Sequence, residues 1–126
     1  MTDFTKLFEW KGDFNEDISR WDVSSAKTMF GLFSYAEKFN IDISGWNVAS
    51  VANMQKTFYS AESFNSDVSS WDTSKVENME GMFERAKSFA QDISSWDVGK
   101  CENMRGMFNG ANAFDKECIK DWAKKP

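Results

Sequence analysis

The sequence predicts an α/β repeat solenoid of about four rungs, each made of a strand, a turn, a short helix and a second turn. The first observation is a period of 25 residues in a chain of 126, in which near-copies of the segment FNEDISRWDVSS recur. The second is that the hydrophobic spacing changes within each repeat from alternation to a helical pattern. One such unit cannot bury its own apolar side chains, so we expect neighbouring repeats to stack.

The repeat is visible as columns of identical residues. Phenylalanine recurs at Phe14, Phe39, Phe64, Phe89 and Phe114. Tryptophan recurs at Trp21, Trp46, Trp71 and Trp96. Methionine recurs at Met29, Met54, Met79 and Met104. Stacked at the strand spacing of about 4.8 Å, these columns would be continuous, and the four tryptophans would form a structural ladder.

The first element of each repeat is expected to be a short strand. Trp21 and Val23 alternate with polar residues and face the core, which is typical of a strand. Ser24 or Ser25 then stands where a helix N-cap is needed. The segment 74–77 (Ser-Lys-Val-Glu) has the form of a capping box.

The second element is expected to be a short helix. Met29, Leu32, Phe33 and Ala36 follow the i, i+3, i+4, i+7 spacing of one helix face. A turn that returns the chain to the next strand is marked by an asparagine in three repeats: Asn15, Asn40 and Asn65.

Residues 1–126 are predicted to form a single domain. Its complete repeats span 14–38, 39–63, 64–88 and 89–113. Residues 1–13 are interpreted as an N-terminal half repeat or cap, and residues 114–126 as a C-terminal partial repeat or cap. Pro126 and the lysines before it suit a terminating edge strand, because charge and a missing N–H donor discourage further pairing.

The composition excludes several classes of partner. The net charge is −5, and Lys and Arg are scattered, whereas nucleic acid and anionic membranes require a concentrated basic patch. No apolar run approaches the roughly 20 residues that span a bilayer, so membrane insertion is not expected. The segment 1–4 (Met-Thr-Asp-Phe) lacks the basic and apolar parts of a secretory signal.

Catalysis has few candidate residues, and we expect a protein that is not an enzyme. The chain contains no histidine, which removes the commonest general base. A hydrolase that uses paired carboxylates is a minor alternative, although acidic columns repeated four times look structural. No cofactor is expected. Cys101 stands in a valine column and Cys118 adjoins Ile119, so both are interpreted as buried free thiols.

An acidic column recurs just before the predicted strands: Asp17, Asp42, Asp67 and Asp92. Stacked carboxylates repel one another, so either a calcium ion or hydrogen bonds must compensate. Calcium wants 6–8 oxygen ligands, and no glycine-rich ligand loop accompanies the column. We therefore favour the interpretation in which each aspartate accepts backbone N–H groups in its own turn, and we expect no metal site.

A polar and acidic face is expected on the outer side of the predicted strands. The residues chosen as its binding positions are Arg20, Asp22, Asn47, Asp72 and Asp97. This surface is interpreted either as a shallow recognition face for a basic or amide-rich partner, or as a solvated face that keeps the protein soluble. The sequence favours neither alternative.

The repeat resembles the BspA-type leucine-rich repeats of bacterial surface proteins, which also occur in mycoplasma lipoproteins. The resemblance rests on the spacing Ile-x-x-Trp-x-Val-x-x-Val-x-x-Met-x-x-x-Phe-x-x-Ala-x-x-Phe, which residues 43–64 follow. It implies a leucine-rich-repeat-like fold with a parallel sheet on one face and helices on the other. It also implies a location at the cell surface or outside the cell, although no lipid-attachment cysteine lies near Met1.

The resemblance and the polar face together lead to a functional expectation. We expect a non-enzymatic protein-interaction or adhesion module that binds a protein partner of unknown identity through the outer sheet face. The alternative is a structural accessory subunit that docks through its solenoid ends or its helix face. Self-association through the ends is a further interaction open to such a protein.

Overall fold

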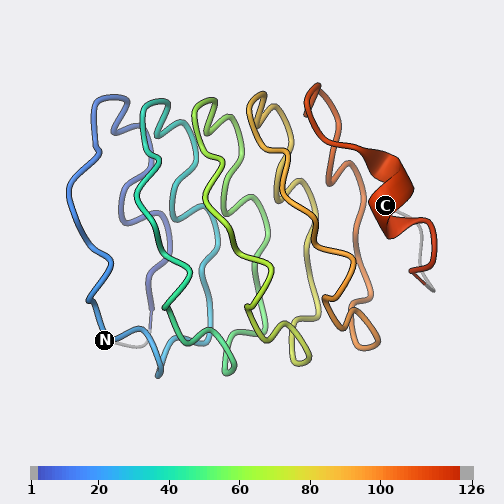
Figure 1. Ribbon diagram of the computed structural model, residues 1–126. Coiled ribbons are helices and arrows are strands. Elements are labelled where there is room, and N and C mark those ends of the chain that lie inside the picture. Colours follow the sequence, from blue (N-terminus) through green and yellow to red (C-terminus); the bar gives the residue numbers. More distant parts are fainter. Residues whose placement is uncertain (1–2, 123–126) are drawn as a thin grey trace.

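The computed structural model describes residues 3–122. The chain winds through successive 25-residue turns, here called coils, which lie side by side from the N-terminal to the C-terminal end (Figure 1). Isolated parallel bridges join equivalent residues of neighbouring coils: Asp3, Thr28, Asn53, Asn78 and Asn103. The 25-residue period is therefore the repeat of the structure as well as of the sequence.

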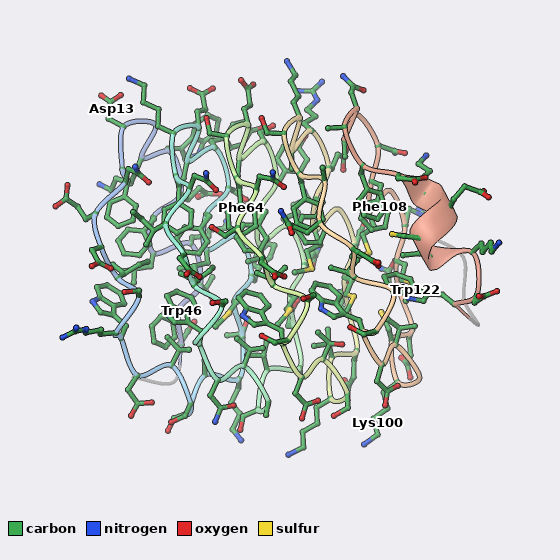
Figure 2. The ribbon with its side chains drawn as sticks, in the orientation of Figure 1. Asp13, Trp46, Phe64, Lys100, Phe108 and Trp122 are labelled. Atoms are coloured by element: carbon green, nitrogen blue, oxygen red, sulfur yellow. The ribbon has the colours of Figure 1, made fainter. Side chains whose placement is uncertain are left out.

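The predicted α/β solenoid with a leucine-rich-repeat-like arrangement is wrong. Within residues 3–122 the only helix is η1, a 3-10 helix at Lys116–Ile119, and parallel pairing is limited to the isolated bridges. The protein is instead a compact fold of turns and irregular backbone around a periodic cluster of aromatic side chains (Figure 2).

Consecutive β-turns replace the predicted helix. We call the segments 3–11, 28–36, 53–61, 78–86 and 103–111 the turn side. In 28–36, the N–H groups of Leu32, Ser34 and Ala36 donate to carbonyls three residues earlier, at 2.9–3.1 Å. Gly31 has a φ of 62° and Tyr35 a φ of 61°, which an α-helix does not allow. The helix-like spacing of apolar residues thus arises from a series of turns.

The intervening N–H groups of the turn side join neighbouring coils. Met29, Gly31, Phe33 and Tyr35 donate to carbonyls 24 residues later, at 2.8–3.0 Å. The turn sides 3–11, 53–61 and 78–86 repeat this pattern. In a β-sheet two neighbouring strands exchange bonds in both directions, whereas within the turn-side segments each coil donates to the next and accepts from the previous one. Bonds in the reverse direction lie beside these segments, as from Ala52 to Lys27 at 2.9 Å and from Ser63 to Glu37 at 3.1 Å. The peptide dipoles of the turn-side bonds consequently point the same way along the stack.

The segments 14–24, 39–49, 64–74, 89–99 and 114–122 form the opposite side, here called the tryptophan side. The parallel sheet expected here is absent, because its N–H groups bond within local turns, such as Trp46 to the carbonyl of Ile43 at 3.1 Å. The predicted capping serines begin no helix. The N–H groups of Ser24 and Ser74 instead donate to Asp22 and Asp72 at 3.0 Å.

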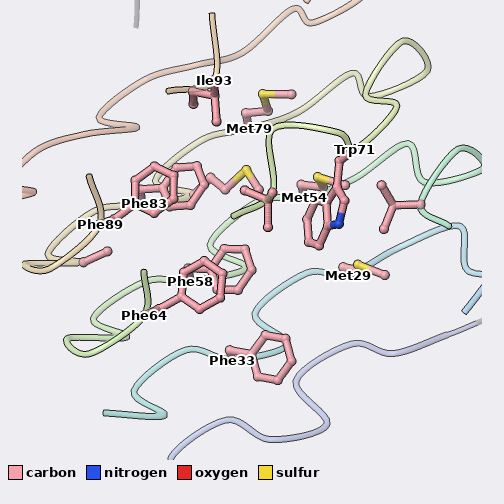
Figure 3. Close-up of a cluster of buried hydrophobic side chains, with 14 of the residues drawn as sticks. Met29, Phe33, Met54, Phe58, Phe64, Trp71, Met79, Phe83, Phe89 and Ile93 are labelled. Carbon is pink, nitrogen blue, oxygen red and sulfur yellow. The ribbon is translucent and has the colours of Figure 1, made fainter. Parts of the chain in front are cut away.

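Two phenylalanine columns form the centre of the core between the two sides (Figure 3). Within one coil the rings of Phe58 and Phe64 stack at 4.0 Å, and Phe58 lies 5.5 Å from the equivalent Phe83 of the next coil. Methionines, valines and isoleucines fill the core on either side of these rings. Full burial of a large apolar side chain stabilises the folded state by about 1.5–3 kcal/mol. The two phenylalanine columns can therefore hold together a backbone that has little regular structure.

The C-terminal end departs from the repeat. Asp115 caps η1 by accepting the N–H of Glu117 at 3.0 Å, and Ile119 and Trp122 enter the core behind it. Residues 114–122 therefore follow the repeat only in part, because their chain first forms the helical turn η1. Pro126 and the lysines expected to terminate an edge strand lie outside the described residues.

Candidate binding face

Two columns of aspartate and asparagine run along the tryptophan side. We call them together the aspartate face, which consists of Asp17, Asp42, Asp67 and Asp92 in one column and Asp22, Asn47, Asp72 and Asp97 in the other. All eight side chains are exposed. In each, the Oδ1 atom accepts the backbone N–H of the residue two positions later, at 2.9–3.0 Å.

The interpretation of the first column as turn-forming aspartates is confirmed by these bonds. Each carboxylate holds a local turn, which satisfies a backbone donor and fixes the direction of the side chain. Among residues 3–122 no group of three or more His, Cys, Asp or Glu side chains is arranged to hold a metal ion.

Hydrogen bonding also favours the ionised form of most carboxyls on this face. Bonds from Ser24 hold the pKa of the Asp22 carboxyl below its usual value, and bonds from Ser74 do the same for Asp72. The pKa of each carboxyl in the first column is lowered in the same way by the serine two residues later. These aspartates are therefore ionised at neutral pH despite their proximity in columns.

The binding residues predicted from the sequence are all on the surface. Arg20, Asp22, Asn47, Asp72 and Asp97 are exposed and occupy two neighbouring positions of the tryptophan side. In Asp22, Asp72 and Asp97 the hydrogen bonds from the protein go to Oδ1. Within the described residues the Oδ2 atoms of these aspartates accept none. Each carboxylate thus has one oxygen oriented by the fold and one that can face a partner.

The tryptophans lie behind this face. Trp46, Trp71 and Trp96 are buried, and each indole N–H donates to a carbonyl of the preceding coil at 2.9–3.1 Å. Trp21 belongs to the first coil, has no preceding coil within the described residues, and is 42% exposed. Ring stacking between tryptophans is seen for Trp71 and Trp96, whose centroids are 6.5 Å apart.

A ladder of asparagine side chains, not predicted from the sequence, also joins the coils. The Oδ1 of Asn15 accepts the N–H of Asn40 at 2.9 Å, and Asn40 and Asn65 repeat the contact with Asn65 and Ala90 at 2.8 Å. Ala90 has no side-chain acceptor, so the ladder stops before η1. The recurrence of asparagine at this position is the signal for the ladder, although asparagine also suits the local turn that the sequence predicts here.

The two cysteines have no role in the face. Cys101 is buried and its thiol donates to the carbonyl of Asn103 at 3.4 Å, whereas Cys118 is half-buried. Burial raises the pKa of the Cys118 thiol, with the carboxylates of Asp92 and Asp115 adding to this effect and a backbone hydrogen bond with Ile93 opposing it. A raised pKa lowers the reactivity of a thiol, because the thiolate is the nucleophile.

The repeated turns and the aspartate columns define a repeat protein with a polar outer face. Residues 2–122 match the family described as "Mycoplasma protein of unknown function, DUF285", and the chain belongs to this family. No curated protein and no solved structure matches the chain. Among residues 3–122, no helix has the length and apolar character needed to cross a bilayer.

Proposed function

We propose that this protein is a non-enzymatic interaction module that binds a basic or amide-rich protein through the aspartate face. The observation that carries the proposal is the fixed orientation of the carboxylates. Side chains that are already held by turns lose little conformational entropy on binding, which improves affinity. The resemblance of the repeat to BspA-type surface proteins supports an interaction or adhesion role at the cell surface.

The charge of the face supports a basic partner. Seven of its eight members are aspartates, with Arg20 and Lys75 as exposed cations near Asp17 and Asp72. Such a field attracts a partner that carries lysine or arginine and speeds its association. The lowered pKa values also support a binding role over catalysis, because a general acid at neutral pH needs a raised carboxyl pKa.

Asparagine substitution provides a sharp test. Asn47 shows that an amide holds the same turn, since its Oδ1 accepts the N–H of Ala49 at 3.0 Å. The triple variant Asp22→Asn, Asp72→Asn, Asp97→Asn therefore removes charge while retaining the turns. A matched control neutralises three glutamates outside the face, Glu77→Gln, Glu84→Gln and Glu102→Gln.

The measurement is capture of proteins from the source organism on the immobilised chain, followed by affinity measurement with each captured protein. We expect the asparagine variant to lose capture and the glutamine control to retain it. Raising the salt concentration to about 0.5 M should release the partner, because salt screens exposed charges. Equal capture by the two variants, with salt-independent affinity, would exclude the aspartate face as the binding surface.

A further inference from the structure

The two ends of the stack carry complementary rows of unpaired backbone groups. At the C-terminal end, four N–H groups make no hydrogen bond within the described residues: those of Met104, Gly106, Phe108 and Gly110. At the N-terminal end, four carbonyls accept none: those of Asp3, Thr5, Leu7 and Glu9. Every interior coil has the equivalent groups paired with its neighbour. The two rows are therefore the two halves of one more interface of the same kind.

The interior of the protein gives the register in which these rows would pair. Each inter-coil bond of the turn side runs from an N–H to a carbonyl 24 residues later, as from Phe83 to Met107 at 2.9 Å. Five coils occupy 125 residues at this period. The same offset therefore joins Gly106 to Thr5 of a second copy, and Phe108 to its Leu7.

We propose that copies of this chain associate head to tail, with the C-terminal end of one copy stacked on the N-terminal end of the next in the interior register. The direction follows from the aligned bonds of the turn side. Because the inter-coil N–H groups within the turn side point toward the C-terminal end, a head-to-tail contact places donors on acceptors. A head-to-head contact would place carbonyl on carbonyl, which leaves both rows unpaired.

Apolar side chains are exposed where the second copy would lie. Leu7, Trp10 and Trp21 are the exposed large hydrophobic residues of the described chain, and all three belong to the first coil. Phe8 and Phe14 are only partly buried there, whereas their equivalents in the interior coils are fully buried. At the other end, a hollow of about 230 Å³ lies between η1 and the last turn side, lined by Gly106, Phe108, Ile119 and their neighbours.

The tryptophan side also carries a donor at one end of the stack and an acceptor at the other. The carbonyl of Ile18 accepts both the N–H of Trp21 at 3.1 Å and the indole N–H of Trp46 at 3.0 Å. Within residues 3–122, the carbonyl of Ile119 accepts the N–H of Trp122 at 3.0 Å but no indole, and the indole of Trp21 donates to no carbonyl. Ile119 stands one residue later than the 25-residue period gives, so head-to-tail stacking places this indole beside the carbonyls of Cys118 and Ile119.

Opposite charges also face each other across the junction. Arg20 precedes Trp21, and Asp121 precedes Trp122, so these two residues occupy equivalent positions in the first and last coils. Equivalent positions of neighbouring coils do form ion pairs, since Lys38 Nζ lies 3.2 Å from Asp13 Oδ1. The contact uses different surfaces in the two copies, so it generates open chains of molecules rather than a closed dimer.

Disulfide trapping tests both the contact and its register. Side chains at the position of Thr5 and Arg105 touch between neighbouring coils, as Gln55 Nε2 and Glu80 Oε1 do at 3.2 Å. A coil spacing of about 4.8 Å lies within the Cα separation that a disulfide accepts. One variant carries Thr5→Cys and a second carries Arg105→Cys, both in a background with Cys101→Val and Cys118→Ser.

The two variants are mixed and oxidised mildly, and the disulfide-linked species are separated by mass. We expect the mixed dimer of the two variants to exceed either self-linked dimer several-fold. The matched control replaces Arg105→Cys by Asn109→Cys, which is exposed in the same coil but out of register, and should give little mixed dimer. A mixed dimer no more abundant than the self-linked dimers, or equal trapping by the control, would overturn the proposal.

A second measurement uses the chain without cysteine replacement. Sedimentation should show mass that rises with protein concentration. The variant Arg20→Asp should associate about fivefold more weakly, in keeping with the modest strength of exposed ion pairs. The double variant Arg20→Asp, Asp121→Arg should regain the association strength of the parent. A mass that stays that of one chain at all concentrations, with melting temperatures unchanged among the variants, would also overturn the proposal. Neither test involves the charges of Asp22, Asp72 or Asp97, so failure here and failure of the proposed function are distinguishable.

Discussion

The buried indole N–H groups are the most specific polar contacts of the core. Each joins a tryptophan to a carbonyl of the preceding coil, as from Trp71 to Ile43 at 3.1 Å. The indole therefore fills the core and connects coils with a single side chain. Trp122 lacks this bond, because its buried Nε1 has no partner within the described residues. The insertion around η1 thus leaves an unpaired polar group at the C-terminal end.

Replacement of Trp71 tests both contributions. Trp71→Phe keeps a ring but leaves the Ile43 carbonyl without the indole, and should lower the free energy of unfolding by about 1 kcal/mol. Trp71→Ala should lower it by about 3–5 kcal/mol, which approaches the whole stability of a small domain. The measurement is chemical denaturation, with Trp21→Phe as a control that should change little because Trp21 is exposed. A Trp71→Ala variant as stable as the parent would exclude a buried, stacking role.

The turn-forming aspartates predict how stability depends on pH. Hydrogen bonds from the serines lower the pKa of Asp42, Asp67 and Asp92 below the reference value of 3.8. A depressed pKa in the folded state means stability that is present above 3.8 and is lost as pH falls through the folded-state pKa. Thermal melts should accordingly be flat from pH 7 to about 5 and decline below about 4.

The control for this pH dependence is an amide in the same turn. A variant with Asp42→Asn, Asp67→Asn and Asp92→Asn keeps the Oδ1 acceptor but does not titrate, so its decline below about pH 4 should be smaller. An equal decline in parent and variant would assign acid unfolding to other groups.

At the scale of the element, the turn side requires residues that accept a positive φ. Two positions in each coil have φ between 55° and 74°, and glycine occupies them at Gly31, Gly81, Gly106 and Gly110. Lysine, tryptophan, tyrosine, serine or arginine occupies the rest, at a cost of about 1–2 kcal/mol for a residue with a Cβ. These positions are where the regular succession of turns is most strained.

Reciprocal substitutions in one coil test this backbone. Gly81→Ala should lower the free energy of unfolding by about 1 kcal/mol, because φ is 59° there and the new Cβ would lie 3.1 Å from Glu84 Oε1. Arg85→Gly, at a φ of 61°, should raise it by up to about 1 kcal/mol. The readout is the denaturation midpoint of each variant. Changes in the opposite directions would mean that these residues do not adopt left-handed backbone.

The element scale also shows what the sequence could predict. The stacking period and the burial of Met29, Leu32, Phe33 and Ala36 follow from the pattern and are confirmed. The conformation does not follow, because an i, i+3, i+4, i+7 spacing fits both a helix and a series of turns. Gly31 and its equivalents were the available signal against a helix, since glycine in a helix interior is unfavourable.

For the candidate binding face and the two ends, too, side-chain spacing predicts which residues are exposed but not how the backbone is hydrogen-bonded. Exposure of Asp22, Asn47, Asp72 and Asp97 follows from their position beside buried tryptophans and is seen in the structure. The unpaired rows at the two ends depend on the direction of the backbone bonds, and that direction has no signature in side-chain periodicity. Only the backbone conformation reveals them.

At the scale of the whole molecule, the aspartate columns bear on metal binding. A calcium ion that bound the native state would stabilise it by about 2.7 kcal/mol at a hundredfold excess over its Kd. Because each Oδ1 already accepts a backbone N–H, we predict that millimolar calcium leaves the melting temperature nearly unchanged, as magnesium does. A calcium-selective rise that Asp67→Asn abolishes would contradict this and assign a metal to the column.

The central claim is that the turn sides of neighbouring coils are joined by backbone hydrogen bonds in which alternate N–H groups donate from each coil to the next. Through-hydrogen-bond couplings between amide nitrogen and carbonyl carbon measure this by NMR in the labelled protein. We predict couplings from the amide of Phe33 to the carbonyl of Thr57 and from Phe58 to Met82, whose bonds are 2.8 and 2.9 Å long. Couplings from these amides to carbonyls four residues earlier would contradict the account in favour of helices. Couplings from amides within 54–61 back to carbonyls within 28–36 would contradict it in favour of a β-sheet.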